Sequence, residues 1–196
     1  ARIRMRSLIA ALRERRKRSA QAQRKAPRHG FSARPWPRFT RGMRQTHTIL
    51  APQMSPRHFQ LVEQAFRCSG YRFKVLPEAG PTAIATGLKY VNNDACYPAI
   101  LTIGQLIEAL QSGEYDLDST AVILTQTGGG CRATNYVGLL RRALEKTGMA
   151  QIPVISLSIG GLEKHPGFRL SLPLLWRGLW AVGYGDNLLR LLYQVR

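Results

Sequence analysis

A strand–helix–strand unit stands out in residues 120–158, whose sequence is TAVILTQTGGGCRATNYVGLLRRALEKTGMAQIPVISLS. Residues 120–125 form a near-continuous apolar run, the pattern of a strand that is covered on both faces of its sheet. Residues 133–147 fit a helix that Gly148 ends, and residues 153–158 fit a further strand. Two strands joined through a helix at this spacing predict a parallel pair with a right-handed crossover.

The same alternation extends toward the N-terminus. Strands are predicted at 47–51 and 71–76, and helices at 58–69, 82–89 and 98–112. The last of these helices places its large apolar side chains on one face, namely Ile100, Ile103, Leu106, Ile107 and Leu110. We therefore predict an α/β fold over residues 46–169, with a Rossmann- or flavodoxin-like parallel sheet of about four strands and flanking helices.

The positive charge of the chain is concentrated at its start. The 196 residues hold 29 Lys and Arg against 11 Asp and Glu, a net charge of +18. Residues 1–47 carry 15 of the basic residues and one acid, whereas the rest carries 14 basic and 10 acidic residues. This distribution excludes a wholly basic nucleic-acid-binding domain, and three cysteines are too few for a disulfide-rich secreted scaffold. No charge-free apolar run reaches 18 residues, so no spanning helix is expected and a cytoplasmic location is predicted.

Residues 1–45 form a basic, arginine-rich extension with three open interpretations. It can be a solvated linker within a larger protein, since no Met stands at position 1. It can be an arm that binds RNA or another polyanion through basic and aromatic side chains, with the candidates Arg13, Arg15, Arg16, Lys17 and Arg18. It can also be an organelle transit peptide, because it is rich in Arg and poor in acids.

Residues 170–196 are strongly apolar and are interrupted by Gly178, Gly183 and Gly185. We predict that they form apolar helices, a pair that packs on the sheet or on a further part of a larger protein. This chain would then be a fragment of that protein. A helix lying at a membrane interface is the alternative.

Two cysteines are predicted to lie beyond the carboxyl ends of strands, where open parallel sheets bind ligands. Cys96 directly precedes the helix over 98–112, and Cys131 lies between the strand over 120–125 and the helix that follows it. The positive end of a helix dipole favours the thiolate and lowers a cysteine pKa. A thiolate is the form that binds metal or attacks an electrophile.

Three glycines, Gly128, Gly129 and Gly130, stand before Cys131 and would let the backbone approach a bulky group. They lack the Lys-Ser/Thr ending of a P-loop and the spacing of a dinucleotide fingerprint. A phosphate or nucleotide binder that uses this loop stays open as a third reading of the function. Cys68 lies near the end of the helix over 58–69 and is predicted to be packed and inert.

Three segments resemble one known family. They are GLKYVNNDACYP at 87–98, QTGGGCRATNY at 126–136 and PVISL at 153–157. All three are similar to the acyl-CoA dehydratase activase-related proteins, long fusions that join ATPase modules to a segment similar to 2-hydroxyacyl-CoA dehydratase subunits. The resemblance covers residues 47–196.

The resemblance implies an oxygen-sensitive [4Fe-4S] cluster in an anaerobic redox system. An ATPase activator would drive one electron at low potential onto the cluster and on to a CoA thioester, which loses water through a radical. Cys96 and Cys131 match cluster-ligand positions of the family, and a third ligand would lie beyond Arg196. Gly128, Gly129 and Gly130 would bring amides close to the cluster. Arg132 would offset its charge, and Asn93 and Asn135 would be polar neighbours.

These observations favour a cluster-bearing module for electron transfer that is inactive alone and depends on an ATPase partner and a further ligand segment. The alternative is a polyanion- or RNA-binding protein that uses the basic arm and keeps the α/β body as its scaffold.

Overall fold

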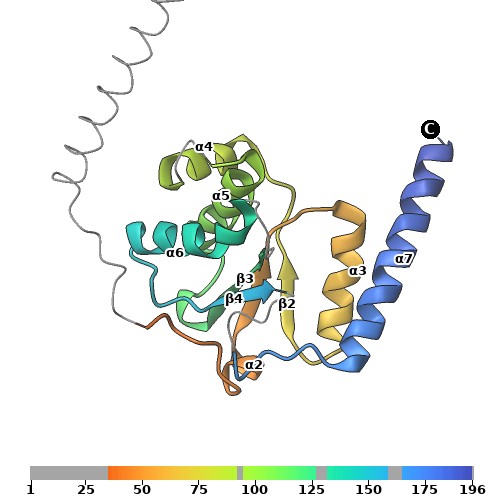
Figure 1. Cartoon of the computed structure of the whole chain (residues 1–196), viewed down its shortest axis with the longest axis horizontal. Helices are drawn as coiled ribbons and strands as arrows, with labels where there is room; N and C mark the ends of the chain where they lie inside the picture. The colour runs from red at the N-terminus through yellow and green to blue at the C-terminus, as the bar shows by residue number, and fades with distance from the viewer. Residues whose placement is uncertain (1–34, 92–94, 127–131, 159–164, 196) are drawn as a thin grey trace, which may run out of the picture. The chain divides into compact units, whose positions relative to one another are not determined.

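The centre of the molecule is a four-stranded, all-parallel sheet. The computed structural model describes residues 35–91, 95–126, 132–158 and 165–195. The strands are β1 (Thr48–Ala51), β2 (Arg72–Val75), β3 (Thr120–Gln126) and β4 (Val154–Ser158). Their order is β2-β1-β3-β4, and neighbouring strands run parallel (Figure 1). This arrangement confirms the predicted α/β class, and the order is that of flavodoxin-like sheets.

Helices cover both faces of the sheet because its central strands are apolar on both sides. One face carries α4 (Pro81–Tyr90), α5 (Tyr97–Gln111) and α6 (Tyr136–Lys146), and the other carries α3 (Pro56–Arg67) (Figure 1). Alternate strand residues enter the two cores. Those packed with α5 and α6 are Leu50, Val122, Leu124 and Val154. Those packed with α3 are Ile49, Ala51, Ala121, Ile123 and Ile155.

The helices lie close to their predicted positions, with one difference at α6. The apolar face predicted for the helix over 98–112 is buried throughout in α5. Gly70, Gly113 and Gly148 follow α3, α5 and α6 with φ of 81°, 79° and 75°. These positive φ values favour glycine at the end of a helix. The predicted helix over 133–147 begins instead with a 3-10 turn, η2 (Arg132–Asn135), and is α-helical only from Tyr136.

The folded unit begins at Trp36, ten residues before the expected boundary at residue 46. Phe39 is fully buried in the core on the α3 side, and its carbonyl accepts a hydrogen bond from the Gly167 amide at 3.0 Å. Its own amide donates to His165 Nδ1 at 3.3 Å. The short helix α2 (Met43–Thr46) then leads into β1. The end of the basic segment therefore belongs to the α/β unit.

The C-terminal apolar segment forms one helix, α7 (Leu172–Val195), and not the predicted pair on the sheet. It packs along α3 and continues through its glycines (Figure 1). Gly185 lies so close to the His58 ring that a side chain there would collide with it. Arg177 donates to the Cys68 carbonyl at 3.1 Å and to Ser69 Oγ at 2.9 Å. Contact with α3 therefore holds the helix despite the low helix propensity of glycine.

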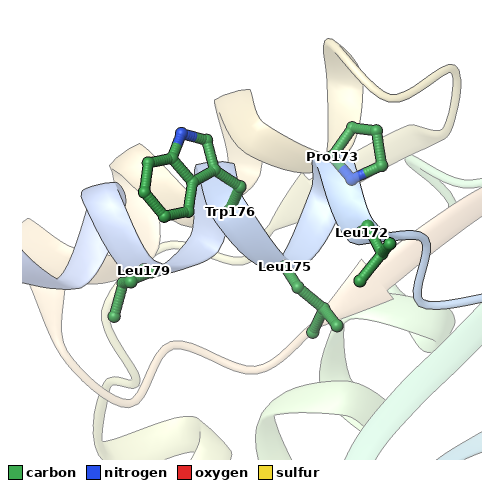
Figure 2. A pocket seen from close by; sticks show the side chains of 5 residues that line it. All are labelled: Leu172, Pro173, Leu175, Trp176 and Leu179. Atoms are coloured by element: carbon green, nitrogen blue, oxygen red, sulfur yellow. The ribbon is translucent and has the colours of Figure 1, made fainter.

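The side of α7 that faces away from α3 is apolar and exposed. Leu172 and Leu179 are 82% and 64% exposed, and Trp176 and Trp180 meet edge to face at 5.9 Å. A shallow hollow of about 490 Å³ lies on the first turns of the helix (Figure 2). It is lined by Leu172, Pro173, Leu175, Trp176 and Leu179. Among the residues described, α7 included, no helix has the length and apolarity needed to cross a membrane.

Candidate functional site

Cys96 is positioned by the first turn of α5. It is the N-cap residue of that helix, with extended backbone angles of φ −66° and ψ 150°, and Pro98 is the second helical residue. Because α5 leads into the amino end of β3, its own first turn lies at the carboxyl edge of the sheet. The thiol is half-buried and packs against the core on the α5 side.

The start of α6 approaches Cys96 from the following loop. Cys96 Sγ lies 2.9 Å from the Tyr136 hydroxyl, and Tyr136 is the first residue of α6. The start of α5, which follows the segment with Cys96, and the start of α6, which follows the segment with Cys131 in the sequence, are therefore in contact. A phenol hydroxyl that donates to sulfur stabilises the thiolate over the thiol.

The loop that connects β3 to η2 contributes residues that the structure does not describe. Cys131 and Gly128, Gly129 and Gly130 fall outside the described residues, as does Asn93 before α5.

Asn135 is described, and its side chain is exposed at the N-cap of α6. It hydrogen bonds to no backbone amide there. Its Oδ1 lies where a side chain on Gly138 would be. The structure therefore brings Cys96 to Tyr136 but leaves Asn135 facing solvent. The arm residues Arg13, Arg15, Arg16, Lys17 and Arg18 lie outside the described part of the chain.

Cys68 is exposed, so the prediction that it is packed was wrong. It is the C-cap residue of α3 and follows Phe66, the last buried residue of that helix. The helical rotation that buries Ala65 and Phe66 turns position 68 toward solvent. Cys68 is therefore an accessible thiol on α3, the helix that covers the opposite face of the sheet from α5.

Gln105 of α5 connects two loops at the carboxyl edge of the sheet. Its Oε1 accepts from the Gln53 amide at 2.9 Å, and its Nε2 donates to the Pro77 carbonyl. These two backbone groups belong to the loops that leave β1 and β2. One buried amide side chain thereby fixes both loops relative to the helix that presents Cys96.

Within the described ranges, no cluster of three or more His, Cys, Asp or Glu side chains could hold a metal ion. At this edge of the sheet the described residues supply one cysteine sulfur, that of Cys96, because Cys68 lies at the end of α3. This sulfur fits a cluster ligand because it is half-buried and lies at a helix N-terminus, where an anionic group is stabilised. Any further ligand has to come from Cys131 or from a segment outside the described residues.

The sequence did not indicate the roles of Tyr136 and Gln105. Tyr136 stands five residues after Cys131, and its place at the start of α6 was hidden because the 3-10 turn moved the helix start. Gln105 lies among apolar residues on the buried face of α5. An isolated polar residue on such a face indicates a buried side chain that needs hydrogen-bond partners, and this is the signal in the sequence.

The Tyr136→Phe variant is expected to slow the alkylation of Cys96 by iodoacetamide several-fold at neutral pH. The substitution removes the hydroxyl that stabilises the thiolate, which is the reactive form. Mass spectrometry of the Cys96 peptide measures the rate. The exposed Cys68 is the internal control, because its rate should not change. Equal Cys96 rates in both proteins would show that the hydroxyl does not act on this sulfur.

Comparison with known proteins identifies no relative. No family model, no curated protein and no solved structure matches the chain.

Proposed function

We propose that this chain is the [4Fe-4S] cluster-bearing module of a redox system of the acyl-CoA dehydratase and activase type, with Cys96 and Cys131 as ligands. The observation that carries the proposal is the contact between Cys96 Sγ and the Tyr136 hydroxyl. It joins the starts of α5 and α6, the two helices that follow the cysteine-containing loops. Both loops carry the sequences that resemble the family.

The surroundings of Cys96 support sulfur ligation. Cys96 stands at the N-terminus of α5, the positive end of the helix dipole, which favours the anionic ligand form. The sulfur is not sealed in the core, so a bulky group can approach it. When bound, a [4Fe-4S] cluster supplies one-electron chemistry at a potential set by hydrogen bonds and solvent exposure. Among the described residues, the Tyr136 hydroxyl and the N-terminus of α5 would act on that potential.

The remaining parts of the proposal rest on the resemblance alone. An ATPase module would deliver the electron, a CoA thioester would receive it, and a further segment would complete the ligand set. The Arg132 side chain would offset cluster charge next to Cys131. A cytoplasmic, reducing setting suits thiolate ligands that must not form disulfides.

The direct test is the iron and acid-labile sulfide content of anaerobically reconstituted protein. Wild-type protein is expected to hold about four of each per cluster. Cys96→Ser and Cys131→Ser should each lose most of this iron and the visible absorption of the cluster. Cys68→Ser is the matched control and should keep both, because Cys68 lies on α3, away from the α5 and α6 helix starts.

Two results would contradict the proposal. One is wild-type protein without iron after reconstitution, supplied both alone and in the longest natural chain that contains this segment. The other is iron retained equally by all three serine variants, which would indicate unspecific binding. Either result would leave polyanion binding by the basic arm as the hypothesis to test, through its salt dependence.

A further inference from the structure

A series of hydrogen bonds links a serine, a histidine and an aspartate near the carboxyl end of β1. Ser55 Oγ lies 2.8 Å from His58 Nδ1, and His58 Nε2 lies 2.9 Å from Asp186 Oδ1. Ser55 and His58 belong to the start of α3, whereas Asp186 comes from α7. The neutral imidazole with its proton on Nε2 satisfies both contacts, since it accepts from the serine and donates to the carboxylate.

These three hydrogen-bonded residues lie where open parallel sheets bind ligands. Ser55 ends the loop that leaves the carboxyl end of β1, four residues after Ala51. From β1 the chain proceeds to β2 on one side, and β3 lies on the other side of β1. The sheet order therefore reverses next to β1, and such a reversal places a crevice at the carboxyl ends of the strands.

The Ser55 hydroxyl does not serve as a helix cap. Ser55 is the N-cap residue of α3, yet its side chain hydrogen bonds to no backbone amide and is directed to the imidazole. The first-turn amides of Arg57 and His58 consequently bond to none of the described residues. Two free amides at a helix N-terminus, next to a hydroxyl, are the donors that stabilise an oxyanion.

The histidine is held between two helices. Its side chain is 16% exposed, and Gly185 of α7 lies directly against its ring. Asp186 is 71% exposed and fixes the ring from the far side. The imidazole therefore has one nitrogen committed to the serine and the other to the carboxylate, as a base that must keep its orientation requires.

A hollow of about 360 Å³ lies on neighbouring residues of α3 and α7, and Ser55, His58 and Asp186 are not among its lining residues. It is lined by Pro56, Arg57, Glu78, Leu189, Leu192 and Tyr193. Pro56 and Arg57 stand directly beside Ser55, and Leu189 lies one helical turn from Asp186. Its proline, leucine and tyrosine walls suit a small apolar acyl group, and its two charged residues suit a polar remainder.

We propose that Ser55, His58 and Asp186 form a hydrolytic site for carboxylic esters with a small apolar acyl group. Ser55 Oγ bonds to the ester carbonyl carbon while its proton passes to His58 Nδ1. The carbonyl oxygen takes the electron pair, facing the amides of Arg57 and His58. The carbon–oxygen bond to the leaving alcohol then breaks, and the alcohol takes the proton from Nδ1. Water repeats the same steps on the acyl-serine and releases the acid and Ser55. Asp186 is a positioning residue.

The test is covalent labelling of the full chain by a fluorophosphonate, with the modified residue located by mass spectrometry. We expect one label, on Ser55, and hydrolysis of p-nitrophenyl acetate that the label abolishes. Ser55→Asp keeps a good helix cap but no nucleophile, so it should fold normally and lose both signals. Ser112→Ala, at the exposed end of α5, is the control and should keep both.

The roles of His58 and Asp186 are tested by the rate at which the fluorophosphonate labels Ser55. His58→Asn should slow labelling about a thousandfold, because general-base assistance is lost. Asp186→Asn should slow it about tenfold or more, and Asp186→Glu should restore much of the loss, which a purely structural contact would not predict. Labelling of Ser55 no faster than that of Ser112 would overturn the proposal. Equal rates for wild type, Asp186→Asn and Asp186→Glu would overturn the role of Asp186.

Discussion

Gly104→Ala is expected to lower the free energy of unfolding by about 3 kcal/mol or more, because the contact between α4 and α5 leaves no room for a methyl group. A Cβ at Gly104 would collide with the Ala83 carbonyl oxygen and with the Gly87 backbone. A Cβ at Gly87 would collide with the Ile100 carbonyl oxygen in the same way. The backbones of α4 and α5 are therefore in contact at this pair of glycines. Relief would require α4 to move away from α5, and α5 is the helix that presents Cys96.

Urea unfolding of wild type and Gly104→Ala measures this effect. Gly178→Ala is the matched control because Gly178 also lies inside a helix, with nothing within 4 Å of an added Cβ. The control should gain about 0.5–1 kcal/mol from the higher helix propensity of alanine. The same substitution is thus expected to act with opposite sign at the two sites. A neutral or stabilising effect at Gly104 would show that α4 and α5 do not touch there.

The layout of the sheet followed from the sequence because short-range patterns determine it. The apolar run of β3 indicated burial on both faces, and the structure places alternate residues of β3 in opposite cores. The buried face of α5 followed from its helical period. Glycines 70, 113 and 148 marked helix ends because each adopts a positive φ. Each of these predictions required neighbours only a few residues apart.

The candidate site was only partly predictable for the same reason. The place of Cys96 before α5 followed from the sequence, since a helix that leads into the amino end of a parallel strand begins at the carboxyl edge of the sheet. Its contact with Tyr136 joins residues 40 apart, and that between His58 and Asp186 joins residues 128 apart. No local pattern specifies such pairs. They depend on how α6 and α7 pack, which is fixed by tertiary contacts.

The apolar C-terminal segment shows how tertiary packing can override a local signal. Gly178, Gly183 and Gly185 predicted a break, since each glycine inside a helix costs about 1 kcal/mol relative to alanine. At Gly185 the missing side chain instead allows α7 to approach the His58 ring on α3. The glycine that disfavours the isolated helix is therefore required where the helix packs.

Phe39→Ala is expected to lower the free energy of unfolding by about 3–5 kcal/mol, because it removes a large side chain from a fully buried position. Phe39 lies in the core on the α3 side and contacts the His47 ring edge to face at 6.3 Å. Its backbone also bonds to Gly167 and His165. The prediction follows from the finding that the α/β unit begins at Trp36 and not at residue 46.

Denaturant unfolding of Phe39→Ala and Leu172→Ala separates burial from side-chain type. Leu172 is also large and apolar but 82% exposed, so its loss should change stability by less than about 0.5 kcal/mol. A chain that begins at residue 47 should be destabilised at least as much as Phe39→Ala, because it lacks the same side chain and its backbone bonds. If Phe39→Ala matched Leu172→Ala instead, residues 36–46 would be a dispensable end of the arm, and the boundary at residue 46 would be correct.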